Sequence, residues 1–182
     1  MPEFYAYHAV TERPMALGQR IVFDGEHVSG VYGRVMEKMP LVQEVYAHPE
    51  RYRAEEMEHH LCVALRELAM EEVRKAEFPQ YPSRMASLYV SKTLPEAEQW
   101  FAFFRRIGRP TFQIVRVQWD GRCFLGNAEL CFQGTPDREE NLRLARKYWQ
   151  NPAVPGETKV TEMLIDGQIE VAEICKQAET AL

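Results

Sequence analysis

The stretch from residue 29 to residue 78 constrains the fold most, because it reads as helical while most of the segments around it read as strands. In its clearest part apolar residues recur at a spacing of three to five, and they are Met57, Leu61, Leu65, Leu68 and Val73. This spacing puts them on one helix face, which we expect to pack into the core. Pro40 and Pro49 predict two shorter helices before the long one, and Pro79 and Pro82 predict its end.

Two strand candidates precede this helical region. The first runs from Phe4 to Val10 and is rich in aromatic residues, with His8 on the same face as Phe4. Because strand side chains alternate between faces, His8 is expected to project from a sheet. The second covers 21–23 and ends at Asp24-Gly25, a pair that favours a turn.

The region after residue 82 predicts a strand and then two helices separated by further strands. Residues 86–90 read as a strand, and Thr93 with Glu96 fits a capping box that opens a helix with an aromatic inner face. A later helix is predicted to open at Thr135-Pro136, with proline at its first position. Its expected inward residues are Leu142, Ala145, Tyr148 and Trp149.

Two Asp-Gly pairs predict turns between consecutive strands. Residues 112–119 and 122–125 flank Asp120-Gly121, which indicates a hairpin. Residues 160–165 and 169–171 flank Asp166-Gly167, which indicates a second strand pair. The sequence therefore predicts an α+β protein.

Composition fits one globular domain over residues 1–182, with 46% hydrophobic and 27% charged residues. A net charge of −5 disfavours a general nucleic-acid binder. No apolar run approaches the roughly 18 residues of a membrane helix, and no secretory leader is evident, so we expect a cytoplasmic protein without a membrane partner. The four cysteines are scattered and the helical histidines lack metal-ligand spacing, so no metal site is predicted.

Three polar residues stand out because each lies on a predicted strand. They are His8 in Tyr7-His8-Ala9-Val10-Thr11, Tyr89 in Leu88-Tyr89-Val90-Ser91, and Glu162 in Thr161-Glu162-Met163-Leu164. Each of them alone is compatible with a purely structural role, since strand tyrosines usually pack and strand histidines are usually structural or exposed. Their order along the chain is more informative than any one of them.

In this order the three segments resemble the ADP-ribosyltransferase superfamily, in particular its His–Tyr–Glu branch. The resemblance covers the first strand, residues 84–107 and residues 148–174. It implies a split antiparallel sheet with a helical segment inserted after the N-terminal strands, and NAD as substrate. It also implies that His8 binds an NAD ribose, Tyr89 packs against nicotinamide, and Glu162 is the catalytic carboxylate at the nicotinamide ribose.

Four further residues flank these positions and are candidate NAD-binding groups. Thr11 and Arg13 follow the first strand, where a hydroxyl or a guanidinium could bind a ribose or the pyrophosphate. Ser87 and Ser91 flank Tyr89, and either hydroxyl could bind the nicotinamide amide. Solvent exposure is the alternative interpretation for all four.

Two departures from the family pattern leave the activity open. Ala9 and Val10 follow His8 where glycine is usual, and Val160 stands where many members carry a second glutamate or glutamine. The predicted function is an ADP-ribosyltransferase or NAD glycohydrolase whose acceptor is a protein, a nucleic acid, a small molecule or water. A noncatalytic nucleotide- or protein-binding module is the alternative. An RNA 2′-phosphotransferase fits less well, because Tyr89 stands where those enzymes tend to carry histidine.

Overall fold

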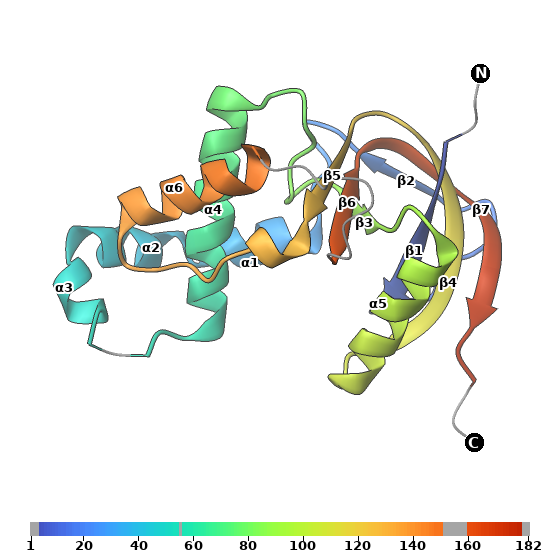
Figure 1. Cartoon of the computed structure of the whole chain (residues 1–182), viewed down its shortest axis with the longest axis horizontal. Helices are drawn as coiled ribbons and strands as arrows, with labels where there is room; N and C mark the ends of the chain where they lie inside the picture. The colour runs from blue at the N-terminus through green and yellow to red at the C-terminus, as the bar shows by residue number, and fades with distance from the viewer. Residues whose placement is uncertain (1–3, 55, 151–159, 180–182) are drawn as a thin grey trace.

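The computed structural model describes residues 4–54, 56–150 and 160–179. In these residues the chain forms six α-helices and two antiparallel sheets, so it is an α+β protein. Figure 1 shows α5 and the sheets at one end of the molecule and the other helices at the other end. In chain order the elements are β1 (Tyr5–Thr11), β2 (Arg20–Phe23), α1 (Gly30–Glu37), α2 (Met39–Ala47), α3 (Pro49–Tyr52), α4 (His59–Glu77), β3 (Leu88–Val90), α5 (Leu94–Arg106), β4 (Thr111–Asp120), β5 (Cys123–Asn127), the 3-10 helix η1 (Ala128–Leu130), α6 (Arg138–Gln150), β6 (Thr161–Ile165) and β7 (Gly167–Gln177).

The two sheets pack face to face. Sheet A has the strand order β1-β4-β7-β2, and sheet B has the order β3-β6-β5. Val10 and Val117 of sheet A share one buried cluster with Leu88 and Ile165 of sheet B. The two sheets also meet at a backbone bridge between Tyr7 and Ser91. Helix α5 covers part of the outer face of sheet A through Ala97 and Phe101.

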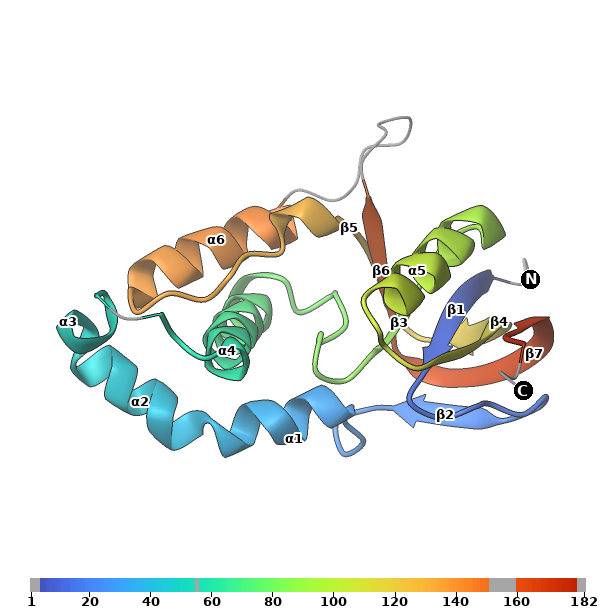
Figure 2. The same ribbon diagram turned by 90° about the horizontal axis from the view of Figure 1, so that it is seen from below.

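The helical region lies against the opposite face of sheet B. Figure 2 shows α4 between α6 on one side and α1 and α2 on the other. Leu61, Leu65 and Val73 of the predicted apolar stripe are buried. Met57 packs against the buried cluster that contains Leu61 and Leu65 but precedes α4, and Pro49 opens an additional short helix, α3. None of the helices in the described residues is long and apolar enough to cross a bilayer.

Two predicted helix starts have different outcomes. Thr93 is the N-cap of α5, as predicted, and its side-chain oxygen accepts a hydrogen bond from the backbone N–H of Glu96. Helix α6 starts at Arg138, two residues after Pro136, so the predicted start was wrong. Asp137 provides the capping oxygen instead, because its carboxylate accepts from the N–H of Glu140. The predicted inward residues of α6 are buried.

Both predicted strand pairs were wrong. Strand β4 pairs with β1 and β7, whereas β5 pairs with β6, so each Asp-Gly pair is a corner at which the chain passes between the two sheets. Asp166 stabilises the corners by accepting from the backbone N–H of Arg122 at 2.6 Å and from its guanidinium at 2.7 and 2.9 Å. An Asp-Gly pair has the same local sequence in a hairpin and in such a corner, so local sequence does not distinguish them.

The two corners pack so closely that each needs a glycine. A Cβ at Gly167 would lie 2.0 Å from the carbonyl oxygen of Asp120, and a Cβ at Gly121 would lie 2.2 Å from that of Asp166. Gly167 also has a φ of 79°. Gly18 has a similar φ of 76° but no heavy atom within 4 Å of a built Cβ, so it isolates the effect of backbone conformation.

We therefore expect Gly167→Ala to lower the free energy of unfolding by about 2–3 kcal/mol, and Gly18→Ala by about 1 kcal/mol. Both variants place alanine in a left-handed conformation, but only the first also forces two backbone segments apart. Chemical denaturation of both variants beside the wild type measures the difference. Equal losses for the two variants would show that the corners do not require the close approach.

Candidate active site

A buried arginine, Arg84, lies at the centre of a polar cluster between sheet B and the helices. It precedes β3 and is only 4% exposed. Its guanidinium binds the Glu67 carboxylate with two hydrogen bonds, from Nε to Oε2 at 2.9 Å and from Nη2 to Oε1 at 3.2 Å. Glu67 is 2% exposed and also pairs with Arg66 at 2.9 Å. A buried carboxylate is thus held between two guanidinium groups.

Arg84 also binds Glu162 and Tyr148 through its remaining nitrogen, Nη1. That nitrogen donates to the Tyr148 hydroxyl at 2.8 Å and to Oε1 of Glu162. The Tyr148 hydroxyl in turn donates to the same Glu162 oxygen. Among the described residues, no group bonds the other carboxylate oxygen, Oε2, so Arg84 and Tyr148 orient Glu162 through one oxygen.

The aromatic residue Tyr89 packs beside this cluster. The Arg84 guanidinium carbon lies 5.5 Å from the centre of the Tyr89 ring and 5.1 Å from that of Tyr148. The Tyr89 hydroxyl donates to the backbone oxygen of Arg84 at 3.3 Å. Cation–π contacts of this kind favour the charged form of a buried arginine. Two aromatic rings therefore flank the guanidinium that binds Glu162.

Strand alternation explains why Tyr89 and Glu162 meet. Tyr89 is paired with Leu164 across β3 and β6, and both side chains point to the helical side of sheet B. Glu162 lies two residues before Leu164, so it points to the same side. Helices α4 and α6 bring Glu67 and Tyr148 to this face. Four separate elements and the Arg84 segment thus assemble the cluster.

The pKa values in the cluster follow from burial and from its charges. Burial alone would lower the pKa of Arg84, but Glu162 and Glu67 outweigh it and raise that pKa well above its ordinary value. Burial would raise the pKa of Glu67, but Arg84 and Arg66 outweigh it and hold that pKa below its usual range. Burial raises the pKa of the Tyr89 and Tyr148 hydroxyls. At neutral pH both tyrosines are therefore hydrogen-bond donors.

His8 contacts this region from the other sheet. Its Nδ1 lies 2.6 Å from the backbone oxygen of Tyr89, so Nδ1 carries the proton and donates it. Burial lowers the pKa of His8 to about 4 despite this hydrogen bond, and the positive charge of Arg109 lowers it further. At neutral pH His8 is uncharged, with Nδ1 bound to β3.

The other predicted residues are placed differently. Ser87 is 3% exposed, and its hydroxyl has no hydrogen-bond partner within the described part of the chain. Ser91 is buried and forms the backbone bridge to Tyr7. Thr11 ends β1, and its carbonyl accepts from the backbone N–H of the exposed Arg13. No hydrogen bond or ion pair found in residues 4–54, 56–150 and 160–179 joins Thr11 or Arg13 to Glu162.

Sequence reasoning missed Arg84 and Glu67, which organise the cluster. One signal was available, because Glu67 lies three residues from both Ala64 and Met70, on the buried face of α4. A carboxylate at such a position needs a buried partner. No comparable signal identified Arg84, which lies in the irregular segment after Pro82.

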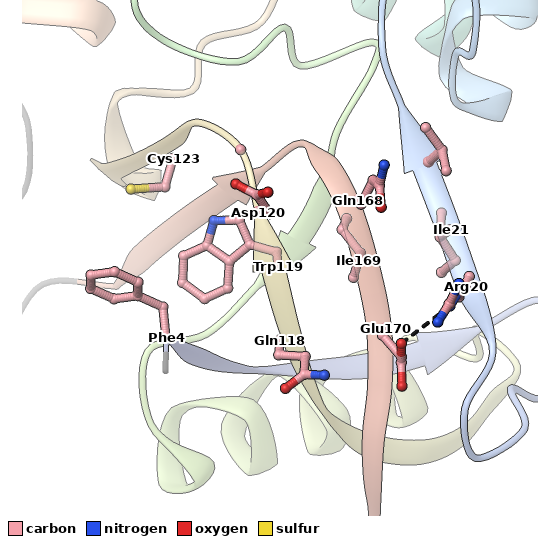
Figure 3. Close-up of a pocket in the computed structure, with 12 residues that line it drawn as sticks. Phe4, Arg20, Ile21, Gln118, Trp119, Asp120, Cys123, Gln168, Ile169 and Glu170 are labelled. Atoms are coloured by element: carbon pink, nitrogen blue, oxygen red, sulfur yellow. Dashed lines mark hydrogen bonds and ion pairs between the residues drawn. The ribbon is translucent and has the colours of Figure 1, made fainter. Parts of the chain in front are cut away.

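A separate hollow lies at the end of sheet A. It has a volume of about 640 Å³, and strands β2, β4 and β7 contribute most of its lining. Figure 3 shows Phe4 beside Trp119 on one side and the Arg20–Glu170 ion pair on the other. Neither Arg84 nor any sequence-predicted site residue lines it. Within the described residues, no group of three His, Cys, Asp or Glu side chains is arranged to hold a metal.

Comparison with known proteins identifies a family but not an activity. No curated protein matches the sequence. A family model described as "Protein of unknown function (DUF2441)" matches residues 6–177. Because this match covers nearly all of the 182 residues, the chain belongs to the DUF2441 family.

Proposed function

We propose that this protein binds NAD and cleaves its nicotinamide–ribose bond on an ADP-ribosyltransferase-like fold. The observation that carries the proposal is the convergence of Tyr89 and Glu162 on Arg84, together with the hydrogen bond from His8 to the Tyr89 backbone. These three strand residues are the ones that the sequence resemblance assigns to NAD. Catalytic groups must lie close together in the folded protein, and their order in the sequence alone does not ensure this.

Each residue has a defined role in this proposal. When the glycosidic bond breaks, its electron pair leaves with nicotinamide, and positive charge develops on the ribose. Glu162 stabilises this charge through Oε2, while Arg84 and Tyr148 fix the carboxylate through Oε1. Tyr89 packs against the nicotinamide ring, and His8 binds a ribose hydroxyl. A water or another nucleophile then attacks the anomeric carbon.

Ser87 adds support for a ligand on this face of the protein. A buried hydroxyl without a hydrogen-bond partner is costly, and a hydrogen bond to a bound ligand would remove that cost. Ser87 lies directly before β3, two residues from Tyr89. We assign the Ser87 hydroxyl to the nicotinamide amide.

One observation favours the noncatalytic alternative. Glu162 takes part in a largely buried ion pair, its side chain being only 12% exposed, and such a group can serve structure alone. A nucleotide-binding module on the same fold would then bind NAD without cleaving it. Measurements of binding and of turnover separate the two functions.

Calorimetric titration with NAD tests the binding part of the proposal. We expect wild type to bind NAD, and Tyr89→Ala to weaken binding about tenfold or more, since stacking on an aromatic ring is worth roughly 1–3 kcal/mol. Tyr89→Phe keeps the ring and should retain most of the affinity. Tyr32→Ala, at an exposed position of α1, is the matched control.

Thermal unfolding of each variant shows whether a loss of affinity reflects a loss of folding. Wild-type affinity in a folded Tyr89→Ala variant would remove Tyr89 from the site. Absence of any heat of binding with the wild type at millimolar NAD would contradict the proposed function itself.

A further inference from the structure

Glu12 has an unfavourable backbone conformation directly after β1. Its φ is 72°, and it is the one non-glycine residue with a positive φ in the described part of the chain. A side chain with a Cβ is strained in this left-handed region, where glycine or asparagine would be at less cost. Strain of this kind persists where the surrounding structure requires it, and it is concentrated at functional sites.

The strained backbone places the Glu12 carboxylate between two arginines. Its Oε1 lies 3.7 Å from Nη2 of Arg109 and 4.0 Å from Nη1 of Arg34. Both distances exceed the roughly 2.7–2.9 Å of a charge-assisted hydrogen bond. The three side chains are 43–64% exposed, so the two pairs contribute little to stability. The strain at Glu12 is therefore not balanced by these contacts.

The two arginines belong to different parts of the molecule. Arg34 lies in the last turn of α1, and Arg109 follows α5, so the two ion pairs of Glu12 link the helical region to the sheet region. The charge of Arg109 reaches His8, because it contributes to lowering the pKa of that residue. Glu12, Arg34 and Arg109, together with Arg13, which follows Glu12 in the sequence, carry three positive charges and one negative charge. Their net charge is +2 on a chain of net −5.

We propose that Arg34 and Arg109 form a pyrophosphate-binding site, which Glu12 occupies as a competing internal anion. The inference rests on the proposed function, because the pyrophosphate would be that of NAD bound beside His8. Two guanidinium groups can bind the two phosphates with short hydrogen bonds that a single distant carboxylate does not satisfy. When pyrophosphate binds, Glu12 leaves the arginines and its backbone is free to relax.

Calorimetry with inorganic pyrophosphate tests this site without requiring NAD chemistry. We expect Glu12→Gln to bind pyrophosphate about fivefold more tightly than wild type. The reason is that the substitution removes the unit negative charge that lies about 4 Å from the two guanidinium groups and competes for them. The double variant Arg34→Gln/Arg109→Gln should bind about 25-fold more weakly on the same basis. Arg20→Gln and Glu170→Gln are matched controls, because they alter an exposed ion pair elsewhere and should leave binding unchanged.

The outcomes for this site and for the proposed function are distinguishable. Equal pyrophosphate affinity in wild type, Glu12→Gln and the double arginine variant would overturn the site, as would an absence of binding to Glu12→Gln. Nicotinamide release that is insensitive to the two arginines would overturn it while leaving the proposed function intact. Pyrophosphate binding with the expected variant effects, but no binding of NAD, would support the anion site and contradict the proposed function.

Discussion

Replacing Arg84 with methionine will lower the free energy of unfolding by about 3–5 kcal/mol. Methionine matches much of the arginine chain, so little volume is lost, but Glu162 and Glu67 then lose their shared cation. Removing one partner of a buried ion pair is costly because an uncompensated charge stays in a region of low dielectric constant. Glu67 still pairs with Arg66, so Glu162 loses more of its compensating positive charge than Glu67 does.

Arg146→Met is the matched control for this change. Arg146 also pairs with a glutamate, Glu77 at 2.7 Å, but both side chains are partly exposed. Exposed pairs contribute about 0–1 kcal/mol, so this variant should unfold almost as wild type does. The loss in the free energy of unfolding for Arg84→Lys should lie between the losses for Arg84→Met and Arg146→Met, because an ammonium group cannot make two bonds to Glu67 and still reach Glu162. Denaturant titrations of the three variants give the comparison, and equal losses for Arg84→Met and Arg146→Met would contradict the central role of Arg84.

The pH dependence of the free energy of unfolding gives an independent signature of the ion pair between Arg84 and Glu67. Arg84 and Arg66 hold the pKa of Glu67 below its unfolded value, despite its burial. The folded state therefore binds fewer protons than the unfolded state as the pH falls below the unfolded pKa, near 4.5. Wild type should lose this contribution as the pH falls through the folded pKa. Arg84→Met lacks most of the stabilisation that ionised Glu67 provides in wild type, so the difference in stability between the two proteins should shrink toward low pH.

Local sequence patterns were enough to predict most of the helices and strands. The apolar stripe of α4, the Thr93 cap and the buried face of α6 each depend on residues close together in the chain, so local sequence contains the required information. Pairing between strands depends on distant residues. The Asp-Gly corners show this, because β4 and β5 are consecutive yet belong to different sheets.

The candidate site was predictable only in part for the same reason. Tyr89 and Glu162 were identified from their strand contexts, and they do lie on one face of sheet B. Arg84 comes from an irregular segment, and its partners come from α4, α6 and β6, which are 17, 64 and 78 residues away. No spacing rule links positions so far apart. The contact between Glu12 and its two arginines was missed for the same reason.

Glu162→Gln should lower nicotinamide release from NAD by at least about 100-fold. Glutamine keeps the shape of the side chain, and its amide oxygen can still accept from Arg84 and Tyr148, but it carries no negative charge to stabilise the developing ribose cation. Losses of roughly 10²–10³ accompany removal of one electrostatic contact to a transition state. Affinity for NAD should change much less, because the substituted amide occupies the same volume. Glu170→Gln, at a partly exposed position on β7, is the matched control.

The most direct test of the account is the rate of nicotinamide release by purified wild type and by Glu162→Gln, measured beside the thermal unfolding of both. We expect release by wild type and by Glu170→Gln, and almost none by a folded Glu162→Gln variant. Nicotinamide release that survives Glu162→Gln unchanged would contradict Glu162 as the catalytic carboxylate. NAD binding by wild type without any release would contradict the cleavage reaction and leave a nucleotide-binding module.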